Sequence, residues 1–217
     1  MKPSAARALI ARHTRLQEVP GLGGLRLHLS DDVLTLWRDV QAATDDPDAP
    51  IPFWAFAWGG GLALAHYLRD HPEVVAGKRV LDLGSGSGLC AIAALTAGAM
   101  SAVAVDVDPI AGIAIALNTR VNGVHVAVVE EDVLDDPPPD ADVILAGDLW
   151  YEQTFGERAT AWLERARDAG IRVLIGDPGR RYLDRDAFTE LATYEVRSTT
   201  DLEDLGRTRA TVYSLDR

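Results

Sequence analysis

A chain of 217 residues is long enough for one α/β domain with a sizeable core and too short for two typical domains and a linker. Its formal net charge of −12 disfavours nucleic-acid binding through phosphate contacts, and its single cysteine, Cys90, excludes an internal disulfide. Apolar runs of signal-peptide or membrane-spanning length are lacking, so we expect a soluble, cytoplasmic protein that binds no membrane.

Residues 1–49 are predicted to form an N-terminal appendage of helices and a hairpin, and residues 50–217 to form the main domain. Within the appendage, residues 3–17 have the pattern of a short helix. Leucines then alternate with other residues across 25–29, after a glycine-rich segment, which predicts a turn followed by a short strand.

Two segments lead from the appendage into the main domain. A helix is expected to start after an N-cap at Ser30 or Asp31 and to end in the polar loop 44–48. Residues 53–58 then contain four aromatic side chains, ahead of three glycines at 59–61 that open another helix. The aromatic run can be a hydrophobic plug beneath this helix, or a cofactor wall beside a helix N-terminus that could meet a carboxylate. Both interpretations can hold at once.

From residue 79 onward, strands alternate with helices, which indicates βαβ units and a mainly parallel sheet with helices on both faces. Strands are predicted at 79–83, 102–106, 125–130, 143–146 and 171–175. Helices are predicted at 90–97, 111–121 and 155–169. Two strand-like runs, 193–198 and 209–215, are joined by the polar segment 199–208 and should form an antiparallel pair at the sheet edge. The predicted fold is therefore a Rossmann-like, doubly wound, seven-stranded sheet.

The segment 82–88, Asp-Leu-Gly-Ser-Gly-Ser-Gly, joins the first of these strands to a helix. Alternating glycines allow left-handed backbone angles and close approach of a ligand, and the following helix offers free N–H groups. The third glycine comes one residue too early for the nicotinamide fingerprint, and no Gly-Lys-Ser/Thr sequence indicates a nucleotide triphosphatase. Asp82 would repel a pyrophosphate but accept a hydrogen bond from an ammonium group. This difference favours S-adenosylmethionine over a dinucleotide.

Three further strand ends carry acidic residues, at the edge where open α/β sheets bind ligands. Asp106 can accept both hydroxyls of a ribose, or it can cap the next helix, although Asp108 is better placed for that cap. Asp132 can accept a hydrogen bond from an adenine amine, or it can be a plain loop acid. Asp148 and Tyr151 directly follow the fourth predicted strand. The ends of four strands therefore converge on one candidate site.

These motifs resemble those of class I, seven-β-strand, S-adenosylmethionine-dependent methyltransferases. The likeness is carried by 82–88, by Val-Asp-Val-Asp-Pro at 105–109 and by Glu131-Asp132. Residues 148–151, Asp-Leu-Trp-Tyr, resemble the Asp-x-x-Tyr/Phe motif of the protein-lysine methyltransferase branch of that class.

A narrower resemblance is to the electron transfer flavoprotein β-subunit lysine methyltransferases. It is carried by Pro-Phe-Trp-Ala-Phe at 52–56, Ile-Ala-Gly at 110–112 and Leu-Ile-Gly-Asp-Pro-Gly-Arg at 174–180. The similarity covers roughly residues 50–181. Two departures are serines in the glycine turn, where animal members carry a cysteine, and Trp150, where phenylalanine is usual.

The resemblance implies specific roles for the candidate residues. Those expected to surround the cofactor are Gly84, Ser85, Gly86 and Gly88, with Asp82 at its methionine amine, Trp58 and Gly60 beside its methionine end, Asp106 at its ribose and Asp132 at its adenine. Asp148 and Tyr151 would face the incoming nucleophile. Because a carboxylate favours the charged form of an amine, we assign Asp148 to capture and orientation rather than to strong general-base work. Trp150 or Tyr151 could line a channel that attracts a cation through its ring face, although Trp150 can instead be core packing.

The predicted function is methyl transfer from S-adenosyl-L-methionine to a lysine ε-amine of a protein, with S-adenosyl-L-homocysteine as product. The acceptor suggested by the resemblance is an electron transfer flavoprotein β subunit. Two alternatives are an N-methyltransferase of a small amine or nicotinamide-like heterocycle, and a non-catalytic cofactor-binding protein, against which the intact Asp148-x-x-Tyr151 motif argues. No metal is expected, because the histidines show no ligand spacing, and the sequence carries no signal for oligomeric state. Asp177, Arg180 and Arg181 form either a salt-bridged turn or a substrate contact.

Overall fold

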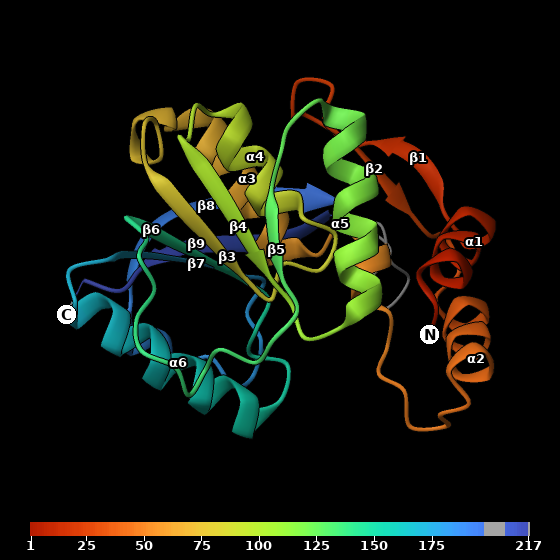
Figure 1. Ribbon diagram of the computed structural model, residues 1–217. Coiled ribbons are helices and arrows are strands. Elements are labelled where there is room, and N and C mark those ends of the chain that lie inside the picture. Colours follow the sequence, from red (N-terminus) through yellow and green to blue (C-terminus); the bar gives the residue numbers. More distant parts are fainter. Residues whose placement is uncertain (198–206, 217) are drawn as a thin grey trace.

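The computed structural model describes residues 1–197 and 207–216 (Figure 1). Its main feature is a seven-stranded sheet with the strand order β5-β4-β3-β6-β7-β9-β8. The strands are β3 (Arg79–Leu83), β4 (Ser101–Val105), β5 (Ala127–Val129), β6 (Val143–Gly147), β7 (Arg172–Asp177), β8 (Thr189–Arg197) and β9 (Arg207–Ser214). The first five are parallel, while β9 is antiparallel to both β7 and β8. The predicted fold class is confirmed, including the antiparallel pair at one edge.

The central strands lie where the hydrophobic pattern predicts them, with β3 matching its predicted bounds. At the edge, β8 starts four residues before the predicted 193–198. Residues 198–206, which include most of the predicted polar connection 199–208, lie outside the described part of the chain.

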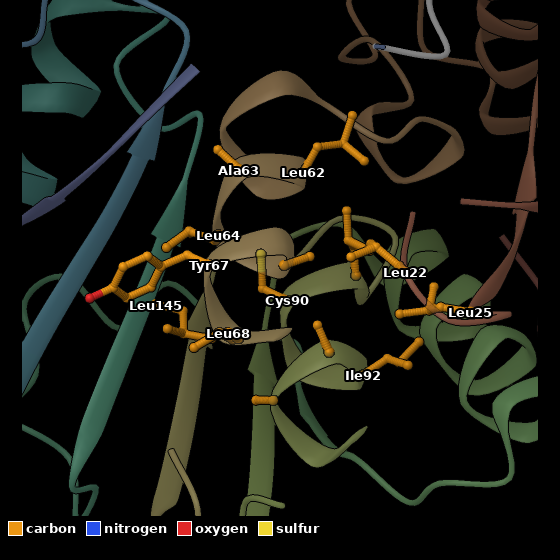
Figure 2. Close-up of a cluster of buried hydrophobic side chains, with 14 of the residues drawn as sticks. Leu22, Leu25, Leu62, Ala63, Leu64, Tyr67, Leu68, Cys90, Ile92 and Leu145 are labelled. Carbon is orange, nitrogen blue, oxygen red and sulfur yellow. The ribbon is translucent and has the colours of Figure 1, made fainter. Parts of the chain in front are cut away.

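Alternate residues of the strands face opposite layers of helices, as the period of two in a strand requires. The helices of this domain are α3 (Gly59–Asp70), α4 (Leu89–Thr96), α5 (Pro109–Asn122) and α6 (Gln153–Asp168), with short 3₁₀ turns η1 (Phe53–Ala55), η2 (Pro72–Val74) and η3 (Arg185–Ala187). Leu145 of β6 packs with α3 and α4 in the cluster of Figure 2, whereas its neighbour Ile144 packs with α6 on the other face. Cys90 belongs to the first cluster.

Local capping explains where two helices of the main domain, α5 and α6, begin. Asp108 caps α5 by accepting a hydrogen bond from the Ile110 amide at 2.8 Å, and Pro109 occupies the first helical position. Glu152 caps α6 through the Thr154 and Phe155 amides. The preference for Asp108 over Asp106 as the cap of α5 is therefore confirmed.

The N-terminal segment contains α1 (Pro3–His13), the antiparallel hairpin β1 (Arg15–Glu18) and β2 (Arg26–Leu29), and α2 (Val33–Thr44). The predicted helix 3–17 is too long. Thr14 is already extended (φ −119°, ψ 155°), and the residues after it pair with β2. The predicted N-cap of α2 is also displaced, because Asp32 rather than Ser30 or Asp31 accepts the Thr35 amide.

This N-terminal segment packs on the main sheet domain through α5 and, by the leucines of its hairpin, through α3 and α4. Buried side chains of α1, α2 and η1 share one hydrophobic cluster with Ile110, Ala111 and Ala114 of α5. The assignment of residues 1–49 to a separate appendage stays a prediction. Across residues 1–197 and 207–216, no helix is both long and apolar enough to span a membrane.

Candidate functional site

A cavity of about 340 Å³ opens at the carboxyl ends of the parallel strands. Its size falls in the range of small-molecule sites. The predicted site residues that line it are Trp58, Asp82, Gly84, Ser85, Gly86, Asp106, Asp132, Asp148 and Tyr151. Gly60, Gly88 and Trp150 are outside the lining that the described residues form. The structure therefore brings most of the predicted residues together in one place.

The glycine turn forms the floor of the cavity between β3 and α4. Gly84, Gly86 and Gly88 all have positive φ angles, of 63°, 53° and 81°, which favour glycine over residues with a Cβ atom. Gly88 serves packing in addition, because a Cβ there would lie 3.3 Å from the side chain of Ile115 on α5. The turn and the adjoining helix are thus fixed by backbone conformation.

Asp82 is buried at the end of β3 beside this turn. Its Oδ2 accepts hydrogen bonds from the Ser85 hydroxyl at 2.6 Å and the Ala91 amide at 3.0 Å. Burial raises the pKa of Asp82 to about 7 in spite of these bonds. A cation placed in the cavity beside Asp82 would favour its ionised form.

Asp106 ties the glycine turn to the end of β4. Its Oδ2 accepts the Gly86 amide at 2.8 Å and its Oδ1 accepts the Asp108 amide at 3.0 Å. Burial raises the pKa of Asp106. A carboxylate has about four acceptor positions, so both oxygens retain capacity for further donors from the cavity.

Asp132 lies at the far end of the cavity and is engaged by neighbouring groups. Its Oδ1 accepts the Leu134 amide at 3.0 Å, and its Oδ2 forms an ion pair with Arg158 of α6 at 3.1 Å. About half of the Asp132 side chain is exposed. Arg158 is 26 residues further along the chain, and no sequence motif links it to Asp132.

Asp148 follows β6 at the opposite end of the cavity. Its backbone is left-handed, with φ of 61°, a conformation that non-glycine residues seldom take. Its Oδ2 accepts the Gly61 amide of α3 at 2.8 Å, and its Oδ1 pairs with Arg180 Nη2 at 3.0 Å. Burial raises the pKa of Asp148, while Arg180 and the helix amides act in the opposite direction.

Arg180 is a site residue whose role the sequence left open. Asp177 accepts the amides of Gly179 and Arg180 through Oδ1, each at 2.6 Å, and so shapes the turn after β7. The guanidinium of Arg180 then lies 5.8 Å from the ring centroid of Trp58 and lines the cavity. The sequence feature that points to Arg180 is the Gly-Asp-Pro-Gly-Arg run at 176–180. The next residue, Arg181, lies over Tyr182 instead.

Aromatic side chains form one wall of the cavity. The ring of Tyr151 lies 5.2 Å from that of Phe53 and 5.5 Å from that of Phe155, and Trp58 is 5.6 Å from Phe53. The Trp58 indole donates to the Phe53 carbonyl at 2.9 Å, which holds this wall in place. Tyr151 remains 45% exposed and so reaches the cavity mouth.

Trp150 points away from this wall. It is 1% exposed, its indole N–H donates to Thr160 of α6 at 3.0 Å, and it packs in the cluster below the sheet. The close approach of α6 is possible because Gly156 has no side chain there, since a Cβ would lie 2.9 Å from the indole. The structure therefore does not support Trp150 as part of a channel wall. It supports the alternative, in which Trp150 packs in the core.

Comparisons with known proteins relate the chain to methyltransferases. Residues 65–149 match the family model of ribosomal protein L11 methyltransferase (PrmA). The chain is 42% identical to the electron transfer flavoprotein beta subunit lysine methyltransferase of Rattus norvegicus over 75% of its own length and 66% of that protein. It thus spans just under two thirds of that relative.

A second relative is aligned over nearly the whole chain. The Xenopus laevis protein of the same name is 35% identical over 97% of this chain and 87% of its own length. Among solved structures, ribosomal protein L11 methylase from Lactobacillus delbrueckii subsp. bulgaricus has a TM-score of 0.51 and 22% identity, covering 71% of this chain and 77% of that one. The last comparison shows a shared fold alone.

Proposed function

The chain belongs to the electron transfer flavoprotein β-subunit lysine methyltransferase family, within class I of the S-adenosylmethionine-dependent methyltransferases, and we propose that it methylates a protein lysine. The observation that carries this proposal is the position of Asp148. The carboxylate is held by Gly61 and Arg180, and it lines the same cavity as Tyr151, the glycine turn and Asp82. A donor side and an acceptor side therefore share one cavity.

The cofactor side fits S-adenosylmethionine. Asp82 is a buried carboxyl group with a pKa raised to about 7, so it would gain from the cationic α-amine of this molecule. Asp106 would bind the ribose hydroxyls with its remaining acceptor capacity, and Asp132 the adenine amine. When bound, S-adenosylmethionine supplies a methyl group on a positively charged sulfur, and S-adenosylhomocysteine is left as product.

The acceptor side must hold an amine in line with that methyl group and in its neutral form. A lysine with a reference pKa near 10.4 is about three units from neutrality at pH 7.4, a cost of about 4 kcal/mol. Tyr151, Phe53 and Phe155 offer ring faces to the lysine stem and its nitrogen. Asp148 is assigned to orienting the amine, since alignment alone contributes strongly to such displacements.

We propose the β subunit of electron transfer flavoprotein as the protein acceptor, because the relatives at 35% and 42% identity carry that name. The test is incubation with labelled S-adenosylmethionine, first with purified β subunit and then with a lysate from the same source. Label in the β-subunit band, located to a lysine by mass spectrometry, supports the proposal. Label confined to the low-mass fraction would favour a small amine instead. Cofactor binding without any label transfer would favour a non-catalytic protein.

A further inference from the structure

Both oxygens of Asp148 are already engaged within this chain. Oδ2 accepts the Gly61 amide, and Oδ1 forms an ion pair with Arg180 Nη2 at 3.0 Å. The side chains of Asp148 and Arg180 are only 9% and 22% exposed. A lysine ammonium that used Asp148 as its counter-ion would have to compete with a cation that is already in place.

Arg180 is held there by two independent contacts besides the ion pair. Its amide donates to Asp177 Oδ1, which fixes the turn after β7, and its guanidinium lies over Trp58 at 5.8 Å. Arginine suits this position because it stays charged and can pair and stack at the same time. The structure therefore supplies a fixed positive charge on the acceptor side of the cavity.

We propose that Arg180 determines which protonation state of the acceptor is admitted: it neutralises Asp148, so that the lysine enters as the neutral amine. This inference rests on the proposed function and concerns the same site. Asp148 then pairs with Arg180 in the turn after β7 and orients the neutral amine, without binding an ammonium. A neutral entering amine is the form that methyl transfer requires.

The surrounding charges agree with this role. Asp148 is faced by Arg180 after β7, by the N-terminus of α3 and by the Cys90 thiol of α4. Arg180 is faced in addition by Asp177 and by Tyr151. Asp177 is buried behind the turn, outside the lining that the described residues form, and burial raises its pKa. The acids Asp82 and Asp106 line the part of the cavity assigned to the cofactor.

An ammonium beside Asp148 would therefore meet a paired carboxylate, the guanidinium and the partial positive charge of a helix N-terminus. A like charge at short range disfavours the protonated form of an amine, by about 1–3 pH units. Removing Arg180 leaves Asp148 available as a counter-ion for the ammonium. The pKa of the bound lysine should then rise.

The experiment measures kcat and kcat/KM against pH, from 6.5 to 10, with S-adenosylmethionine and the β subunit of electron transfer flavoprotein. Arg180→Met and Arg180→Gln should move the acidic limb of the kcat profile upward by about 1–2 pH units. Arg180→Lys keeps the charge and should keep the limb in place. Arg181→Met removes a neighbouring exposed charge and serves as the matched control, with an unchanged profile.

Profiles of the Met and Gln variants that superimpose on the parental profile would overturn the inference, as would an equal shift in the Lys variant. Titration with S-adenosylhomocysteine checks that each variant keeps a folded cofactor site. A parental protein that fails to methylate the β subunit would instead refute the proposed function, before the variants are compared.

A measurement on the parental protein does not depend on the folding of any variant. Binding of the β subunit to the S-adenosylhomocysteine complex is followed by calorimetry at pH 7.5, in buffers of different ionisation enthalpy. The inference expects release of about one proton, since a lysine in water is protonated at this pH. A β subunit with the methylated lysine changed to methionine should release none. Equal proton release by both β subunits would contradict entry of a neutral amine.

Discussion

A Cβ atom on Gly60 would lie 2.1 Å from the carbonyl oxygen of Gly176, and a Cβ on Gly176 would lie equally close to the carbonyl oxygen of Gly60. The first turn of α3 therefore rests directly on the end of β7, backbone against backbone. This contact brings the amide of Gly61 within 2.8 Å of Asp148. Glycine is required at both positions, because a side chain on either residue would separate α3 from β7.

Gly176→Ala and Gly60→Ala should each displace α3 or strain β7. We expect each variant to lose at least about 1–3 kcal/mol of unfolding free energy, as overpacking of a core does, measured by urea denaturation. Gly61→Ala is the matched control in the same helix, because its Cβ would meet only the Cys90 sulfur, at 3.6 Å, and the Leu89 side chain. Equal stability of all three variants would show that the backbone contact can relax freely.

Asp148→Ala should reduce kcat by at least about 100-fold, because the acceptor amine loses the group that orients it. S-adenosylhomocysteine binding should change little, since the proposed cofactor contacts are made by the glycine turn, Asp82, Asp106 and Asp132 and not by Asp148. Methylation of the β subunit and calorimetric titration measure the two effects. Asp168→Ala, which removes an exposed acid of α6, is the control. Near-normal turnover by the Asp148 variant would exclude it from the reaction.

Asn118 of α5 connects the glycine turn to the N-terminal hairpin. Its Nδ2 donates to the Ser87 carbonyl at 2.8 Å, and its Oδ1 accepts the His28 amide at 2.7 Å. Asn118→Ala should leave both backbone groups unpaired, at about 1–3 kcal/mol each, and should weaken S-adenosylhomocysteine binding about tenfold as the turn loosens.

Asn122→Ala is the matched control for this prediction. Asn122 makes the same kind of bridge to the backbone of Arg26 without touching the glycine turn. Its removal should lower stability but leave the dissociation constant of S-adenosylhomocysteine unchanged. If both variants weakened binding equally, the link through Ser87 would have no special role.

Asp82 should make the stability of the cofactor-free protein fall as pH rises. Its pKa is raised to about 7 in the folded state from an ordinary value of 3.8, so the folded protein binds an extra proton between these two pH values. The folded state opposes the ionisation of Asp82, which lowers the unfolding free energy. This loss is absent below pH 4 and complete above pH 7. Asp82→Asn should therefore gain about 2–3 kcal/mol relative to the parental protein between pH 5 and pH 8.

Urea denaturation at the two pH values measures this difference. Asp142→Asn is the control, because Arg79 lowers the pKa of Asp142 to about 2 and its contribution is constant between pH 5 and pH 8. A parallel pH dependence in the Asp82 variant and the parental protein would contradict the assignment.

The main sheet could be predicted from the sequence because its strands are strongly apolar and its helix starts carry local signals, such as Asp108 before Pro109. Strand β1 could not, since Arg15–Glu18 becomes a strand only through pairing with β2, whose paired residues lie 8 to 14 positions further on. The local sequence pattern of residues 3–17 predicts that α1 continues past Thr14. Pairing over such a distance overrides helix propensity.

The candidate site shows the same division. The acids at the strand ends were predicted because parallel strands place their carboxyl ends at one edge. Their partners were not, because the Asp148–Arg180 pair joins residues 32 positions apart through the conformation of two turns. The orientation of Trp150 likewise depends on the close approach of α6 at Gly156, which no local pattern records.

The hydrogen bond between His28 and Asn118 also bears on how the chain folds during synthesis. These residues are 90 positions apart, so at about 5–20 residues per second the hairpin leaves the ribosome roughly 5–20 s before α5 does. Leu27 and Leu29, which are fully buried in the finished protein, share a hydrophobic cluster with α3 and α4, and both helices are synthesised before α5. The two helices therefore offer the nascent hairpin an apolar surface before α5 completes its hydrogen bonds.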